Sequence, residues 1–125
     1  MNLVDSSGWL EYFADGPNAD FFAPVIAKTR RLLVPTVSLY EVFKRILQQS
    51  SENVALQAIA GMQQGLVVEL TVPIALSAAR LSLQHGFPLA DSVILATAHT
   101  HGAILWTQDA DFEGMDGVEF VRRRG

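Results

Sequence analysis

The sequence predicts a single α/β domain with a mostly parallel sheet, and three observations support this prediction. Short apolar runs alternate with longer segments of helical periodicity, a pattern typical of parallel strands joined by helices. The length of 125 residues suits one domain, and half of the residues are hydrophobic, which is enough for a packed core. No repeat, low-complexity tract or linker divides the chain.

Five short apolar runs are predicted as strands because they have the length and character of buried segments. They are residues 3–4, 32–34, 66–72, 103–106 and 118–121. The last of them is expected at an edge of the sheet. In open sheets of this kind, ligands bind beyond the carboxyl ends of the strands, so a functional site is expected there.

The first helices are predicted from their apolar spacing. Trp9 and Phe13 indicate a helix after the first strand, and Asn18 could cap the next segment, which Pro24 is expected to kink or split. The following helix has an apolar face at positions i, i+3, i+4, i+7 and i+8. These positions are Leu39, Val42, Phe43, Ile46 and Leu47.

Three more helices are predicted in the second half of the chain. The first of them covers about residues 52–64. Pro73 suits the first residue of the next helix, which should end near residue 85. Residues 89–100 are nearly apolar on every side, which indicates a buried helix that Gly102 would stop.

The composition excludes several classes of protein. With no cysteine, the chain has no disulfide framework, cysteine nucleophile, thiolate zinc site or iron–sulfur cluster. No apolar run approaches the roughly 18 residues of a membrane span, and the first residues lack the basic start of a secretory signal. We therefore expect a soluble cytoplasmic protein without a membrane partner. The net charge of −4 ordinarily disfavours a nucleic-acid partner.

Acidic residues stand where predicted strands end or helices begin. Asp5 follows the first strand, Asp109 and Asp111 follow the fourth, and Asp91 opens the apolar helix. Each has an ordinary structural explanation. Asp5 could be an N-cap, Asp91 an N-cap or a partner of the helix dipole, and Asp109 and Asp111 turn residues.

Glu41 also stands at the start of a predicted helix and has two structural alternatives. Ser38 and Glu41 match a capping box, in which the Glu side chain reaches back to the backbone of the N-cap Ser. Glu41 also precedes Arg45 by four residues, so the two could form an exposed ion pair.

Taken together, these junctions predict a metal pocket, because they lie on one rim of a parallel sheet. Two carboxylates about 4 Å apart repel by roughly 4 kcal/mol at an effective dielectric constant of 20, so several cannot stay ionised without cations or protons. Oxygen ligands favour Mg²⁺ or Mn²⁺ over zinc. His85, His99 and His101 offer no competing site and are expected to face solvent.

Four segments in this order resemble the PIN-domain nucleases, in particular the VapC-type toxins of bacterial toxin–antitoxin modules. The most specific segment is 86–98, Gly-Phe-Pro-Leu-Ala-Asp-Ser-Val-Ile-Leu-Ala-Thr-Ala, followed by 105–112, Leu-Trp-Thr-Gln-Asp-Ala-Asp-Phe. Segments 4–9 and 38–42 supply the other two motifs. The resemblance implies one PIN domain over residues 1–125, with three α/β/α layers and a four- to five-stranded sheet.

The resemblance implies catalytic roles for Asp5, Glu41, Asp91 and Asp109. Asp5 and Asp91 would be the primary metal ligands, with Asp109 also at the metal. Glu41 and Asp109 would complete the pocket or orient the attacking water. Without these four residues, the remaining acidic residues equal the 9 Lys plus Arg. The net charge is therefore better interpreted as that of a nearly neutral protein with a metal pocket.

Ser6, Thr107 and Asp111 match positions that support the site in the family. Gln108 stands where arginine is frequent, which removes one possible phosphate contact but leaves the acidic set intact.

The implied function is Mg²⁺-dependent (or Mn²⁺-dependent) hydrolysis of RNA by a toxin endoribonuclease. A VapB-like antitoxin and a homodimer are the partners that the resemblance implies. Arg122, Arg123 and Arg124 could form a solvated tail or contact RNA phosphates beside the acidic site.

Three alternatives remain open at this point. The chain could be a PIN-like interaction module without catalysis, or a PIN nuclease of RNA processing or decay. An aspartyl-phosphate phosphatase or receiver domain is disfavoured because it needs a lysine after a late strand. The chain contains only Lys28 and Lys44.

Overall fold

The computed structural model describes residues 1–124 and contains a five-stranded sheet in the order β3-β2-β1-β4-β5. The strands are β1 (Asn2–Val4), β2 (Leu32–Pro35), β3 (Leu66–Val68), β4 (Ile104–Thr107) and β5 (Val118–Phe120). Every neighbouring pair is parallel. The prediction of a mostly parallel sheet is confirmed, as is the position of the last strand at an edge.

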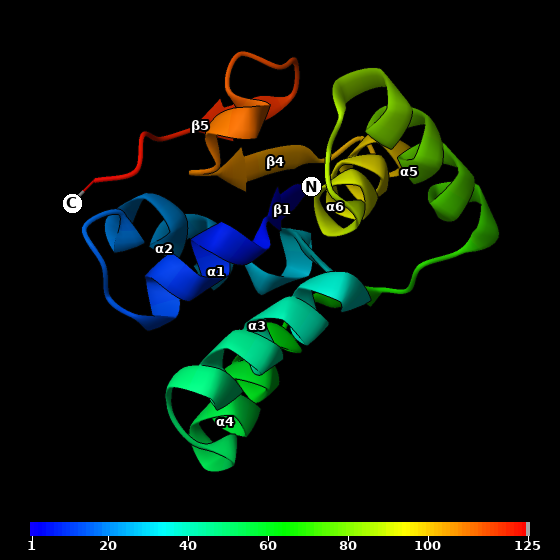
Figure 1. Cartoon of the computed structure of the whole chain (residues 1–125). Helices are drawn as coiled ribbons and strands as arrows, with labels where there is room; N and C mark the ends of the chain where they lie inside the picture. Colours follow the sequence, from blue (N-terminus) through cyan, green and yellow to red (C-terminus); the bar gives the residue numbers. More distant parts are fainter. Residues whose placement is uncertain (125) are drawn as a thin grey trace.

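The helices cover both faces of the sheet. They are α1 (Ser6–Phe13), α2 (Ala19–Ala27), α3 (Thr36–Gln49), α4 (Glu52–Met62), α5 (Val72–His85) and α6 (Leu89–Thr100), with short 3-10 turns η1 (Thr29–Arg31) and η2 (Ala110–Phe112). Figure 1 shows α5 and α6 on one side and α1 and α2 on the other, with α3 and α4 extending away from the sheet as a hairpin. No helix within residues 1–124 has the length and apolarity needed to cross a membrane.

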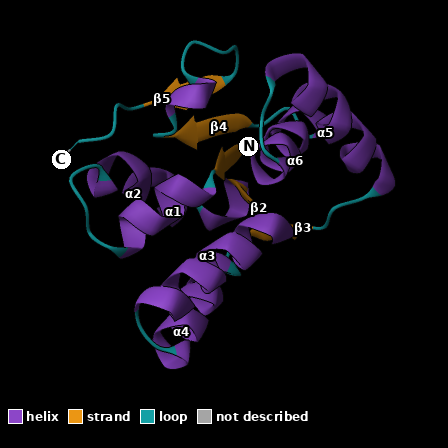
Figure 2. Cartoon of the chain, viewed as in Figure 1, coloured by secondary structure: helices purple, strands orange, loops and turns teal. Residues whose placement is uncertain are grey.

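The core divides at the sheet because successive strand residues point to opposite faces. Leu3 packs with Ile94 and Leu95 of α6. Its neighbour Val4 packs on the other face with residues of α1 and α2, among them Trp9. The three-layer α/β/α architecture is therefore confirmed, and Figure 2 shows the strands between the two sets of helices.

The central position of β1 places two chain junctions side by side. Val4 pairs with Trp106 of β4, so the carboxyl ends of β1 and β4 lie at the same edge of the sheet. The residues that follow them in sequence are therefore neighbours in space, which is the basis of the site described below.

The sequence prediction for α2 is wrong in one respect, because the helix is neither split nor ended at Pro24. Proline leaves only the carbonyl four residues earlier without its helical donor, here that of Asp20, an exposed residue in the first turn. The buried side chains of Phe22 and Val25 hold the helix on the core. Asn18 precedes this helix but makes no side-chain capping bond.

The observed N-termini of α3 and α5 correct two further predictions. The helix α3 begins at Thr36 with Pro35 as its N-cap, so Ser38 lies inside the first turn and cannot form the capping box with Glu41. The predicted strand 66–72 is a strand only as far as Val68, because Thr71 caps α5 by accepting a hydrogen bond from the Ile74 backbone N–H at 3.4 Å.

Candidate active site

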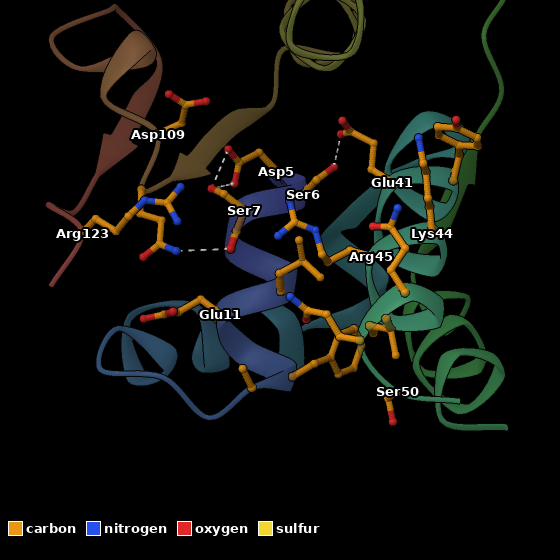
Figure 3. Close-up of a pocket in the computed structure, with 18 of the residues that line it drawn as sticks. Asp5, Ser6, Ser7, Glu11, Glu41, Lys44, Arg45, Ser50, Asp109 and Arg123 are labelled. Carbon is orange, nitrogen blue, oxygen red and sulfur yellow. Dashed lines mark hydrogen bonds between the residues drawn. The ribbon is translucent and has the colours of Figure 1, made fainter. Parts of the chain in front are cut away.

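Carboxylates from four separate segments line one groove with a volume of about 710 Å³. Asp5 follows β1, Glu41 lies on α3, Asp91 lies in the first turn of α6, and Asp109 follows β4. Figure 3 shows Asp5, Glu41 and Asp109 gathered at the end of the groove opposite Ser50. The structure thus brings together all four residues that the sequence selected, while their catalytic roles stay a prediction.

Asp5 is buried and is held by several donors. Its Oδ1 accepts hydrogen bonds from the Gly8 backbone N–H at 2.9 Å and the Ser7 hydroxyl at 2.8 Å. Its Oδ2 accepts one from the Thr107 hydroxyl at 2.6 Å. Asp5 therefore caps α1 and also faces the groove. Burial raises its pKa to about 6, although the hydrogen bonds from Thr107, Gly8 and Ser7 oppose that rise.

Asp91 is half-buried and sits among like charges. Burial, followed by the charges of Asp109, Asp5 and Glu41, raises its pKa to about 7. Its position in the first turn of α6 favours a negative charge. It is not the N-cap, which is Pro88. With its pKa raised to about 7, the Asp91 carboxyl is mostly protonated below neutral pH, and a cation bound in the groove favours its ionised form.

Three carboxylates are close enough to share a cation. Asp91, Asp109 and Asp111 each offer an oxygen atom, and these atoms lie within 4.8 Å of one another. Such an all-oxygen set suits a hard divalent ion. Asp5 is outside this triplet, and Asp111, which the sequence ranked as a supporting residue, is inside it.

The Thr107 hydroxyl links the acidic residues of neighbouring strands. It donates to Asp5 Oδ2 at 2.6 Å and accepts from the Asp109 backbone N–H at 2.9 Å. Asp109 Oδ1 in turn accepts from the Asp111 backbone N–H at 3.0 Å. The turn explanation for Asp109 is therefore correct, and the same turn brings it and Asp111 to the groove end.

Glu41 is held by α1. The Ser6 hydroxyl donates to Glu41 Oε1 at 2.6 Å. Ser6, which the resemblance implies is a supporting residue, therefore holds the Glu41 side chain, for which it implies a catalytic role. Both side chains also line the groove.

Sequence reasoning named Arg45 only as a possible ion-pair partner of Glu41 and did not place Lys44 or Arg45 in the site. Lys44 and Arg45 line the groove from α3. Their spacing of three and four residues after Glu41 puts them on the same helix face, and this was the signal that could have found them. Figure 3 draws Arg45 and Arg123 on opposite sides of Ser7. Of the three consecutive arginines, Arg123 lines the groove, whereas Arg124 bonds the loop before α2.

The three histidines are exposed, as the sequence predicted. None of them lines the groove.

Comparison with known proteins identifies the family. The model of the PIN domain family matches residues 3–118. The chain belongs to the PIN domain family. The Asp5, Glu41, Asp91 and Asp109 positions all lie within the matched range. A comparison with curated proteins finds no match.

Solved structures share the fold of this PIN domain at low identity. A toxin–antitoxin complex from Klebsiella pneumoniae is similar with a TM-score of 0.78 and 22% identity, covering 95% of this chain and 96% of the other. VapC20 from Mycobacterium tuberculosis, a Sarcin-Ricin loop cleaving toxin, gives 0.76 and 17%, covering 90% and 92%. DNA-bound VapBC from Salmonella typhimurium gives 0.76 and 15%, covering 98% of each chain.

Proposed function

We propose that this PIN domain is a Mg²⁺-dependent endoribonuclease that acts as the toxin of a VapBC-type module, with RNA as substrate and a VapB-like antitoxin as partner. The groove carries the proposal, because carboxylates from four segments line it and three of the site's carboxylates reach one another within 4.8 Å. The similar structures support it. One is a toxin–antitoxin complex, one is VapBC, and one is a Sarcin-Ricin loop cleaving toxin.

In this proposal, different residues of the groove bind the cation, orient the attacking water and attract the RNA backbone. Asp91, Asp109 and Asp111 would hold the cation, and Asp5, the other metal ligand that the resemblance implies, lies near enough to Asp91 to raise its pKa. When bound, Mg²⁺ or Mn²⁺ makes water a better nucleophile and offsets charge on the phosphoryl oxygens. Glu41 orients the attacking water, since Ser6 holds its Oε1 in place. Arg45 and Arg123 in the walls attract the phosphate backbone.

The first test is cleavage of purified total RNA with Mg²⁺, with Mn²⁺ and with EDTA, followed by mapping of new 5′ ends. We expect cleavage with either ion and none with EDTA. The variant Asp91→Asn should lose at least about a hundredfold in rate, because it removes a ligand of the ion that stabilises the transition state.

The matched control is Asp116→Asn, the same change at an exposed carboxylate that does not line the groove. It should cleave at the wild-type rate. Cleavage by Asp91→Asn at the wild-type rate would sink the assignment. Failure of Mn²⁺ to bind in isothermal titration would instead favour a non-catalytic module.

The toxin role has its own test. Induced expression of the wild type, but not of Asp91→Asn, should arrest bacterial growth, and co-expression of a small open reading frame immediately upstream should relieve the arrest. Cleavage of RNA without growth arrest would instead place the nuclease in RNA processing or decay. A homodimer and a cytoplasmic location stay predictions, to be tested by light scattering and cell fractionation.

A further inference from the structure

The segment that follows β5 is fastened to the loop before α2. Asn18 Nδ2 donates to the Arg122 carbonyl at 2.9 Å, and Arg124 Nε donates to Asn18 Oδ1 at 3.1 Å. The Arg124 guanidinium also donates to the Pro17 carbonyl. Figure 1 shows this end of the chain beside the loop between α1 and α2.

Further hydrogen bonds connect Asn18 to the acidic end of the groove. Asn18, only 2% exposed, also donates to Gln108 Oε1 at 3.0 Å. Gln108 is 3% exposed and donates to the Ser7 carbonyl at 3.3 Å. Ser7 in turn bonds Asp5, and Gln108 directly precedes Asp109. A polar network therefore joins the carboxylates to the segment, and the side-chain nitrogen and oxygen atoms of Asn18 and Gln108 all have hydrogen-bond partners in it.

The network assigns different surroundings to the three arginines. Arg124 is held against Asn18 and Pro17, and Arg122 is fastened through its backbone carbonyl. Arg123, between them, lines the groove. The Val121 backbone N–H donates to the Thr107 carbonyl at 3.1 Å, which fixes the start of the segment to β4.

We propose that Asn18, Gln108 and Arg124 form an anchor that positions Arg123 as a phosphate contact of the RNA strand, while Arg122 and Arg124 make no RNA contact. This inference rests on the proposed ribonuclease function. A guanidinium matches phosphate with two parallel N–H donors. Because the anchor already orders this segment in the free protein, RNA binding does not have to offset the entropy cost of ordering it. The anchor thus holds the residues on both sides of a positive group that lines the same groove as the carboxylates, which repel RNA.

The experiment measures affinity for a fluorescein-labelled single-stranded RNA of mixed sequence between 50 and 300 mM KCl. It uses the full chain carrying Asp91→Asn, so that the probe is not cleaved. Arg123→Ala should weaken binding about tenfold, equivalent to about 1.4 kcal/mol. It should also lower the slope of log K against log salt by about 0.7, the value for one lost phosphate contact to a single strand.

The anchor is tested by a matched pair on the same segment. Arg124→Ala and Arg122→Ala each remove one exposed arginine, but only Arg124→Ala breaks side-chain bonds of the anchor. We expect Arg124→Ala to reproduce the loss and the slope change of Arg123→Ala, and Arg122→Ala to resemble the parent. In the double variant, Arg124→Ala should add nothing to Arg123→Ala, because both act through one contact.

A neutral variant separates position from charge. Asn18→Ala removes no charge, yet it should lower the salt slope as Arg123→Ala does. If Asn18→Ala fails to fold, Arg124→Ala decides alone, since its side chain is exposed. Equal effects of Arg122→Ala and Arg124→Ala would overturn the anchor. If neither the parent nor the wild type binds RNA, the proposed function itself fails, which is a different result.

Discussion

At the scale of residues, one hydroxyl links two of the four acidic residues that the sequence selected, Asp5 and Asp109. Thr107 uses both its donor and an acceptor position, toward Asp5 and toward the Asp109 backbone. Asp5 is at the same time the N-cap of α1, and replacing such a cap with alanine costs roughly 1 kcal/mol. Substitutions of Asp5 therefore mix structural and catalytic effects. Asp91 is the better residue on which to test the chemistry.

The raised pKa values predict how stability depends on pH. They are about 7 for Asp91 and about 6 for Asp5, against an ordinary 3.8. Between about pH 4 and pH 7 the folded protein therefore binds more protons at these carboxyls than the unfolded chain does. The contribution of these two groups to the free energy of unfolding therefore falls as the pH rises through this window, and it levels off above it.

Asp91→Asn, which cannot ionise, should remove the Asp91 part of this fall. In EDTA we expect its free energy of unfolding to exceed that of the wild type by about 1–2 kcal/mol at pH 8, a modest value because solvent screens a half-buried carboxyl. The difference should be smaller at pH 5, because the Asp91 carboxyl of the folded wild type is still protonated there. Urea titrations at the two pH values measure the difference. Asp116→Asn should show no such change with pH. An equal difference for Asp91→Asn at both pH values would contradict the prediction.

At the scale of elements, the close approach of α1 to β1 and α2 depends on a glycine. A Cβ added to Gly8 would lie 2.6 Å from Phe22 Cε1 and 2.7 Å from Val4 Cγ1, and both neighbours are fully buried. We expect Gly8→Ala to lower the free energy of unfolding by about 1–3 kcal/mol, because an overpacked core must shift. Thermal and urea unfolding measure this loss.

Gly61 in α4 provides the opposite case. A Cβ there would meet nothing nearer than Phe13 Cε1 at 4.0 Å. Gly61→Ala should therefore raise the free energy of unfolding by about 0.5–1 kcal/mol, since alanine favours a helix. A loss of stability at Gly61, or none at Gly8, would show that α1 and α4 do not pack as described.

For one helix, the hydrophobic pattern of the sequence was enough to predict both the helix and its burial. Residues 89–100 are apolar on nearly every side, and α6 is buried over most of its length. Pro24 and Ser38 misled the prediction because proline and capping rules are local. Burial of Phe22 and Val25 holds α2 through the proline, and Pro35 moves the start of α3 ahead of Ser38.

At the scale of the whole molecule, cation binding should couple to folding. An ion that binds only the folded state at a hundred times its dissociation constant adds about 2.7 kcal/mol to the free energy of unfolding. We expect Mn²⁺ to raise the melting temperature and EDTA to reverse the change. Asp111→Asn should lose most of this rise, whereas Asp116→Asn, at a residue that is also exposed, should keep it. Retention of the full rise by Asp111→Asn would remove Asp111 from the ligand set.

The sequence by itself determined the α/β class and placed Asp5, Asp91 and Asp109 at strand ends and helix starts, because both follow from local periodicity and from the geometry of parallel strands, whereas Glu41 lies in the second turn of α3. Only the tertiary structure decided that Asp111 joins Asp91 and Asp109, that Asn18 bonds Gln108, and that Arg123 alone of three consecutive arginines lines the groove. Asn18 and Gln108 are 90 residues apart. Such contacts depend on how helices and loops pack over the sheet, and no local pattern encodes that packing.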